Sequence, residues 1–231
     1  MEAEWVAAIA NVIIACGIII GIFQFIATNK QVALLASQLD AANKQVELFA
    51  SQLKADHERS RCAEAINNVR EWTNQLDETQ PAARKLVNNF TIEQCHALRG
   101  KEPFSIPSSN VKLLEYIFQG TLEEQEFHKM KDPNGDIMLN QKHLSHLYFL
   151  VISHLNTLEV CLLTWVMGIA DKKTMESQLR YLVNPEKNEY ILANFRQAMG
   201  GANSYPAIEA FVNHLRSQIT PAAPVLRENL A

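Results

Sequence analysis

The residues best suited to chemistry in this sequence are a glutamate, an arginine and a tyrosine near apolar segments. Glu159 falls inside the strongly apolar run 139–167, where an unpaired carboxylate would be costly. Arg196 and Arg180 are its candidate partners. We predict a buried ion pair between Glu159 and Arg196 that fixes the register of two helices. The alternative is a polar ligand pocket formed by Glu159, Arg196 and Tyr205.

Motifs for other chemistries are absent or incomplete. The sequence has no phosphate-binding glycine loop, no nucleophile elbow and no Cys-x-x-Cys pair. His143, His146 and His154 share one predicted helix, but a metal site would need further ligands. The segment 132–136 resembles the start of a calcium loop. Ile137 stands where such a loop needs glycine and His143 where it needs glutamate, so the segment predicts a turn. We therefore expect no metal, no cofactor and no catalytic residue.

The composition of the chain limits the kind of partner and the compartment that we expect. The chain has 231 residues, with 21 Lys+Arg against 25 Asp+Glu, and the net charge of −4 argues against a nucleic-acid partner. A hydrophobic content of 48% is enough for a folded core. Three cysteines remain outside the apolar N-terminal segment, too few for a disulfide framework, which favours a reducing compartment.

The N-terminal segment 5–27 predicts a membrane helix. It contains no charged side chain, and 23 helical residues rise about 34 Å, enough for a hydrocarbon core of about 30 Å. A cleaved signal peptide is the alternative, but no Lys or Arg precedes Lys30 to form its basic region. We expect a permanent anchor in contact with membrane lipid, after a short exterior tail, residues 1–4.

The flanking charges predict the orientation of this anchor. Glu2 and Glu4 precede the apolar segment, whereas Lys30, Lys44 and Lys54 follow it. The positive-inside rule then places the N-terminus outside and the long C-terminal part in the cytoplasm.

A short internal repeat follows the apolar segment and predicts a coiled-coil stalk, residues 28–57. The run 30–39 recurs as 44–53, an offset of two heptads. Apolar residues at a and d positions form the stripe of a left-handed coiled coil, namely Val32, Leu35, Leu39, Val46, Phe49 and Leu53, with Ala42 between them.

The same register extends into the apolar segment. Asn11 falls at an a position, and Gly17 and Gly21 form a G-x-x-x-G pair that lets two helices approach closely in lipid. Asn11 would then hydrogen-bond its copy on a partner helix. These features predict a parallel homo-oligomer joined through one continuous helix. The alternative is that the stripe packs on the chain's own C-terminal domain.

Residues 58–217 predict an all-α domain of seven or eight helices, followed by a tail, residues 218–231. All eight prolines fall at helix boundaries or in the tail. The expected boundary signals are a break at Gln80-Pro81, a capping box at Thr91–Gln94, an end at Gly100, a loop over 101–109, a helix over 110–119, a cap at Thr121, and helix starts at Asn184-Pro185 and Ser204–Pro206.

The longest helix of this domain is expected over 139–167. Its residues are apolar nearly all round, which predicts either a buried core helix or a second membrane span. Glu159 near its middle favours the core helix, because a charge at the bilayer centre is costly. Gly168 is expected to end this helix and Asp171 to cap the next one.

Two short motifs resemble those of a family of uncharacterised bacterial proteins with an N-terminal membrane helix and a helical cytoplasmic domain. They are Leu155–Glu159, followed by Gly168–Asp171, with Arg196 and the run Tyr205–Phe211 matching the distal part of the pattern. The resemblance covers about residues 60–217. Thr157 departs from it, since the family often has Phe there. It implies this architecture in a bacterial inner membrane and no assigned activity.

These observations predict a membrane-anchored oligomeric scaffold or partner-binding protein, without catalysis. The alternative is a signal-responsive membrane effector of the toxin or phage-defence type, in which ligand or partner binding to the helical domain rearranges the membrane helices. An unidentified protein partner fits both.

Overall fold

The computed structural model describes residues 2–119, 130–131, 135–184 and 189–219. Within these ranges the chain is mostly helical with very little strand, which confirms the predicted all-α class. The chain divides into two compact units, Met1–His57 and Glu58–Ala231. A predicted cap at Thr121 and part of the predicted turn over 132–136 lie outside the described residues.

Helix α1 extends from Glu2 to Gln75 and contains the whole apolar segment and the repeat. Its continuity follows from composition, because no proline occurs in it and its glycines are confined to positions 17 and 21. The prediction of one continuous helix through the apolar segment and the repeat is confirmed, and the helix continues past His57. Its last turns belong to the second unit, where Ala65 and Trp72 are buried in the core.

The helices of the second unit begin close to the expected signals. In α2 (Gln80–Val87) a proline occupies the first turn, and in α3 (Ile92–Gly100) both hydrogen bonds of the Thr91–Gln94 capping box are present. Lys101, rather than Gly100, takes the left-handed conformation after α3, with φ 58°. The first three helices after α1 are α2 (Gln80–Val87), α3 (Ile92–Gly100) and α4 (Val111–Ile117), with a 3-10 turn, η1 (Ser108–Asn110), before α4.

Helix α6 (Gln141–Val166) is the longest in this unit. Asn140 caps its start, and Gly168, with φ 69°, follows its end as predicted. Asp171 caps α7 (Lys172–Leu179) by accepting a hydrogen bond from the Thr174 backbone, also as predicted. A 3-10 turn, η2 (Arg180–Leu182), follows.

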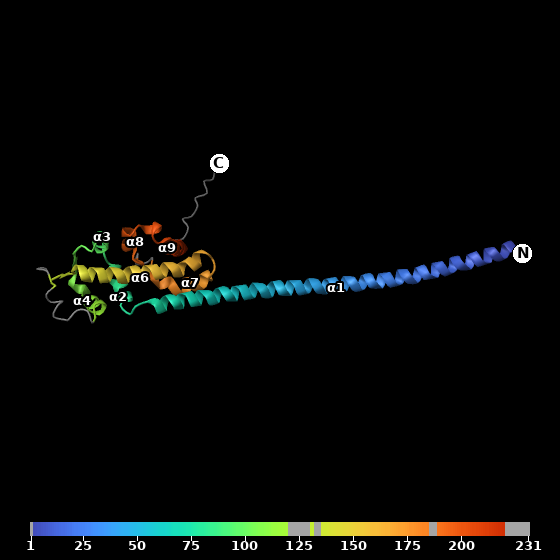
Figure 1. Ribbon diagram of the computed structural model, residues 1–231, viewed down its shortest axis with the longest axis horizontal. Coiled ribbons are helices and arrows are strands. Elements are labelled where there is room, and N and C mark those ends of the chain that lie inside the picture. The colour runs from blue at the N-terminus through green and yellow to red at the C-terminus, as the bar shows by residue number, and fades with distance from the viewer. Residues whose placement is uncertain (1, 120–129, 132–134, 185–188, 220–231) are drawn as a thin grey trace, which may run out of the picture. The chain divides into compact units, whose positions relative to one another are not determined.

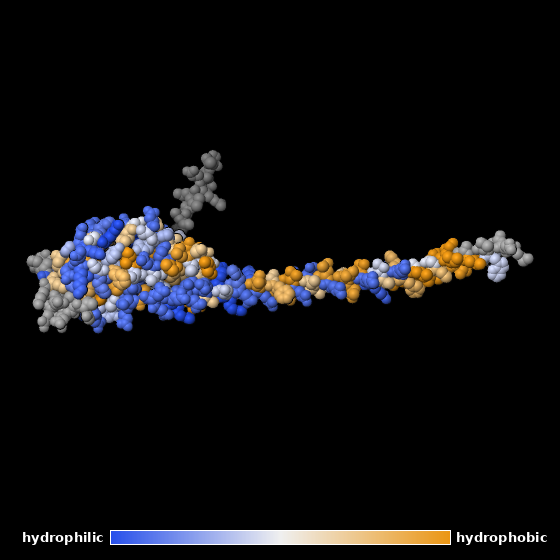
Figure 2. All heavy atoms as spheres, viewed as in Figure 1, coloured by the Kyte–Doolittle hydropathy of each residue, from blue (hydrophilic) through white to orange (hydrophobic). Residues whose placement is uncertain are grey.

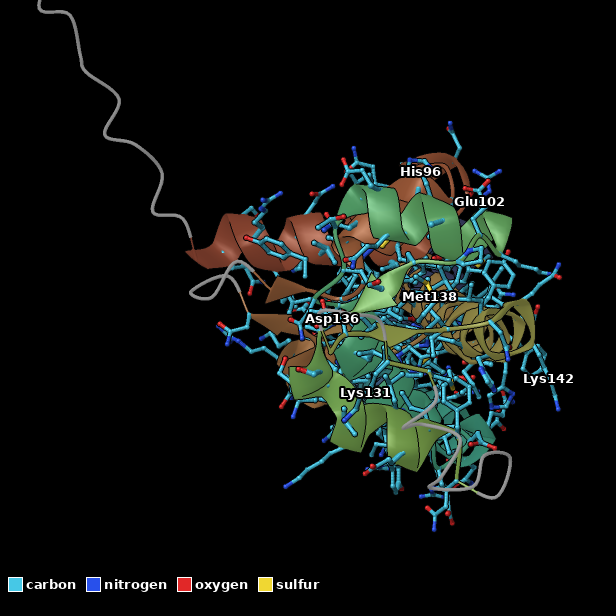
Figure 3. The ribbon with its side chains drawn as sticks, turned by 90° about the vertical axis from the view of Figure 1, so that its left-hand side faces the viewer. His96, Glu102, Lys131, Asp136, Met138 and Lys142 are labelled. Atoms are coloured by element: carbon cyan, nitrogen blue, oxygen red, sulfur yellow. The ribbon has the colours of Figure 1, made fainter. Side chains whose placement is uncertain are left out.

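Two antiparallel pairs of two-residue strands replace elements expected to be loop or helix. The expected loop over 101–109 contains β1 (Ser105–Ile106), which pairs with β2 (Ile137–Met138). Figure 3 shows Lys131, Asp136 and Met138 at this ribbon. The expected helix start at Asn184 is wrong, because Asn184 ends β3 (Val183–Asn184), which pairs with β4 (Glu189–Tyr190).

The last helices are α8 (Ala193–Ala198) and α9 (Pro206–Ile219), joined by the 3-10 turn η4 (Gly201–Asn203). Helix α6 contacts α2, α3 and α9. Figure 1 shows it between α2 on one side and α3 and α9 on the other. Its buried face includes Leu144, Leu147, Leu155 and Leu158. Its outer face leaves Phe149 and Val160 more than 60% exposed, so the helix is covered on one face and not all round.

Candidate functional site

The apolar part of α1 has no protein cover in the structure. Large side chains along it are exposed, with Ile13 at 66% and Phe25 at 68%. The helix is long and apolar enough to cross a membrane, and none of its most apolar stretch is buried. Helix α6 is also long and apolar enough to cross a membrane, but 44% of its most apolar stretch is buried in the protein. Figure 2 shows apolar side chains covering the N-terminal part of α1.

The predicted stripe in the following part of α1 is exposed in the same way. Val32, Leu39 and Leu53 on the a positions are 58%, 64% and 75% exposed. Leu34 and Leu48, at c positions beside the stripe, are exposed to a similar degree, 59% and 62%. Apolar residues and polar residues alternate along this part of the helix (Figure 2). It is therefore an amphipathic helix whose apolar face has no partner among the described residues of one chain.

The other predicted association residues are also accessible. Asn11 is exposed. A methyl group added at Gly17 or Gly21 would meet no atom within 4 Å, apart from the helix's own backbone. The two glycines lie one helical turn apart and leave a shallow, open face on α1.

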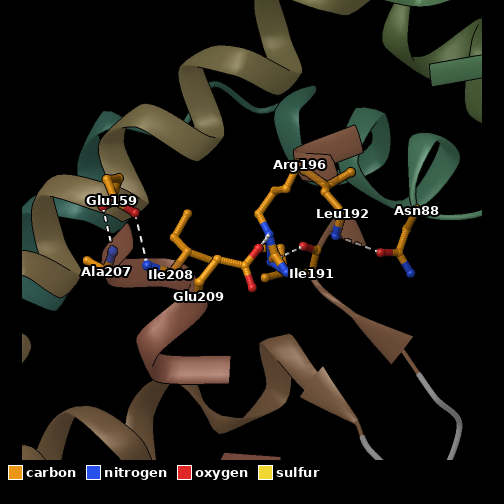
Figure 4. Close-up of polar contacts among 8 residues, drawn as sticks. All are labelled: Asn88, Glu159, Ile191, Leu192, Arg196, Ala207, Ile208 and Glu209. Atoms are coloured by element: carbon orange, nitrogen blue, oxygen red, sulfur yellow. Dashed lines mark hydrogen bonds and ion pairs between the residues drawn. The ribbon is translucent and has the colours of Figure 1, made fainter. Parts of the chain in front are cut away.

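Glu159 binds the start of α9 rather than an arginine. Its Oε1 accepts a hydrogen bond from the Ala207 backbone N–H (2.7 Å) and its Oε2 accepts one from the Ile208 N–H (2.9 Å). Figure 4 shows both bonds. These amides belong to the first turn of α9, which has no intrahelical acceptor for them and carries a partial positive charge. A carboxylate from α6 thus caps α9.

The predicted ion pair between Glu159 and Arg196 is wrong, because each residue binds a different partner. Arg196 on α8 is 3% exposed and pairs with Glu209 on α9, with Nε···Oε1 3.1 Å. It also donates to the carbonyl oxygen of Ile191 (2.7 Å), as Figure 4 shows. Burial lowers the pKa of Arg196, and the negative charges of Glu209 and Glu159 oppose this. Glu159 thus acts on Arg196 through space.

Tyr205 precedes α9 and lies near both groups. It is 4% exposed, and burial raises the pKa of its hydroxyl, with Tyr148 and Glu159 acting in the same direction. The sequence therefore identified three residues of one neighbourhood. It missed Glu209, the direct partner of Arg196. The only signal for Glu209 is its place in the first turn of a helix, where acids are common.

A cleft of about 370 Å³ lies over this region, lined by residues of α8, η4 and α9 and by Tyr190. The Arg216 guanidinium lies over the Tyr190 ring at 4.4 Å, and its Nε donates to the tyrosine hydroxyl (3.2 Å). Arg196 and Glu209 form part of its wall. In this wall Arg196 pairs with Glu209, and Arg216 contacts the neutral Tyr190 side chain.

The histidines of α6 serve packing. His143 and His146 contact the Phe118 ring, and His154 contacts the Trp72 ring at 5.8 Å. Within the described residues, no group of three or more His, Cys, Asp or Glu is arranged to hold a metal ion.

Comparisons with protein-family models, with curated proteins and with solved structures found no match for this chain.

Proposed function

We propose that this protein is a single-pass membrane protein that self-associates through α1 and presents its all-α domain to a protein partner in the cytoplasm. The observation that carries this proposal is the unbroken helix Glu2–Gln75, in which an uncharged apolar segment runs directly into an exposed heptad stripe. The first part of α1 thus has the composition of a membrane helix, and the part that follows has the composition of a coiled-coil helix.

A second copy of α1 is the partner that fits the stripe best. Its a and d side chains would fill holes on an identical helix in parallel register, and each square ångström removed from water contributes about 25 cal/mol. Asn11 and the Gly17–Gly21 pair continue the same face through the apolar segment. A parallel arrangement places both membrane segments in one bilayer with the same orientation.

The flanking charges support an inner-membrane location with a cytoplasmic domain. Lys30, Lys44 and Lys54 follow the apolar segment, and no Lys or Arg precedes it.

The domain is best explained as a binding module. The charged groups where α6 and α8 meet α9 serve the fold, since Glu159 caps α9 and Arg196 pairs with Glu209. The cleft beside them is polar and open, which suits contact with a protein surface.

Site-specific disulfide formation in native membranes tests the proposed contact. In a background with Cys16 and Cys62 replaced by Ser, Leu39→Cys should cross-link two copies upon oxidation. Leu34→Cys, at a c position with a similar exposure, is the matched control and should remain monomeric. Equal cross-linking at both positions, or none at Leu39→Cys, contradicts the proposed seam.

A signal-responsive membrane effector is the second candidate, supported by how α1 ends. Ala65 and Trp72 are buried in the domain, and the Asp171 backbone N–H donates to the carbonyl oxygen of Arg61 (3.0 Å). A rearrangement of the α1 helices would therefore alter contacts inside the domain. This candidate predicts growth arrest upon overexpression that Asn11→Leu relieves, whereas the scaffold predicts no arrest.

A further inference from the structure

The pocket between α2 and α4 contains an arginine, Arg84, that forms no ion pair with the residues that the structure describes. Its volume is about 660 Å³, and its walls come from α2, α4 and the residues just before and just after α2. Arg84 and Lys85 supply its positive charges, and Asn89 and Tyr116 supply neutral polar groups. Glu78 also lines the pocket but forms no ion pair with Arg84.

Arg84 makes no side-chain hydrogen bond or ion pair with any residue that the structure describes, although its Nε atom is buried. Arg84 is partly buried, and proteins normally pair a guanidinium that is drawn even partly out of water with an anion. Burial lowers the pKa of Arg84, and the group that opposes this is the Tyr181 hydroxyl rather than a carboxylate.

The same fold shows how a buried arginine is normally satisfied. Arg196, which is 3% exposed, has both a carboxylate partner, Glu209, and a backbone carbonyl partner, Ile191. Arg84 has neither. The difference leaves the Arg84 guanidinium available to an anion.

Further buried polar atoms among the described residues also lack partners. Both ring nitrogens of His154, Nε1 of Trp72 and Oε1 of Gln80 are buried without a hydrogen bond, and each of these side chains is at most 5% exposed. The His154 and Trp72 rings are 5.8 Å apart. The Arg84 charge reaches this interior, because it contributes to lowering the pKa of His154.

We propose that the α2–α4 pocket binds a small molecule bearing a phosphate or carboxylate group, with Arg84 as its counter-charge. The planar guanidinium matches both oxyanions with two parallel hydrogen bonds, and Lys85 adds a second positive charge. Leu113 and Pro81 provide apolar wall for the rest of the molecule, and the volume is typical of small-molecule sites. The site goes beyond the proposed function and does not depend on self-association.

Thermal unfolding of the full chain in a maltoside detergent, which carries neither phosphate nor carboxylate, tests the site. Inorganic phosphate and acetate are the probes, each compared with chloride at equal ionic strength. We expect a saturable rise in Tm of about 3 °C for at least one probe at roughly ten times its Kd. A response to phosphate alone assigns a phosphate ligand, and a response to acetate assigns a carboxylate.

Two variants make the test specific. Arg84→Met keeps the packing of the side-chain stem, and it should abolish the anion response while leaving Tm in chloride unchanged or higher. Arg70→Met removes an exposed arginine of α1 and should respond like the natural chain. An anion response that survives Arg84→Met, or no response of the natural chain to either probe, overturns the proposal.

Discussion

Glu159 on α6 binds the backbone N–H of Ala207 on α9, with 2.7 Å between Oε1 and the amide nitrogen. Its second oxygen binds the neighbouring amide of Ile208 at 2.9 Å. Tyr205 occupies the position before α9 where a short polar side chain usually caps a helix. Its hydroxyl is at the far end of an aromatic ring, so it cannot replace these bonds. One acidic side chain therefore fixes where α9 begins and how it meets the central helix of the domain.

Replacing Glu159 by Gln should destabilise the domain by about 2 kcal/mol. The amide retains one acceptor oxygen, so one backbone N–H loses its partner and the charge at the helix start disappears. Urea unfolding of the full chain in detergent, followed by the fluorescence of Trp72 and Trp165, measures the change. Glu115→Gln, on the exposed face of α4, is the control and should change stability by less than about 0.5 kcal/mol. Equal stability of both variants would contradict the capping role.

The pair formed by Arg196 and Glu209 should show strong coupling. Glu209→Met leaves the buried Arg196 charge with only the Ile191 carbonyl as a direct partner and should cost about 3 kcal/mol. Adding Arg196→Met removes that unpaired charge, so the double variant should be more stable than the sum of the single changes by about 1 kcal/mol or more. Strictly additive effects in this cycle would show that the two groups act independently.

His154 should make the domain sensitive to acid. Burial lowers the pKa of its imidazole to about 4, and the Arg84 charge acts in the same direction. Between that value and the ordinary 6.5, the unfolded chain binds a proton that the folded chain does not. Stability is therefore complete above about pH 6.5 and falls by about 3 kcal/mol as the pH decreases to 4.

The His154→Gln variant isolates this contribution. The difference in unfolding free energy between the natural chain and this variant should decrease as the pH falls from 7 to 4, because glutamine does not titrate. His57→Gln, which changes an exposed histidine, should leave the pH profile unchanged. A pH-independent difference for His154→Gln would mean that its side chain is accessible to protons in the folded state.

Most helix boundaries could be predicted because their signals are local. The capping box at Thr91, the glycine after α6 and the cap at Asp171 each involve residues within a few positions of one another. The β3–β4 pair was missed because the dipeptide Asn184-Pro185 is as typical of a helix start as of the connection between two strands. At that point the local sequence did not distinguish between the two.

The site was harder to predict, because its contacts join residues far apart in the sequence. The sequence correctly indicated that Glu159 needs a partner, but opposite charge alone suggested that this partner is Arg196. The structure instead uses backbone amides for one and Glu209 for the other. Such amides are revealed only by the packing of α6 on α9. Arg84 gave no sequence signal, because an unpaired arginine is recognised only from its surroundings.

The central claim, self-association through the stripe on α1, is tested most directly by the molar mass of the full chain in detergent, measured by light scattering. The double variant Leu39→Gln/Leu53→Gln changes two a positions. The control Leu34→Gln/Leu48→Gln changes two c positions with the same residue type and the same spacing of fourteen residues. We predict an oligomer for the natural chain and for the control, and a shift toward monomer for the a-position variant. A monomeric natural chain, or an equal loss of mass in both variants, would contradict the account.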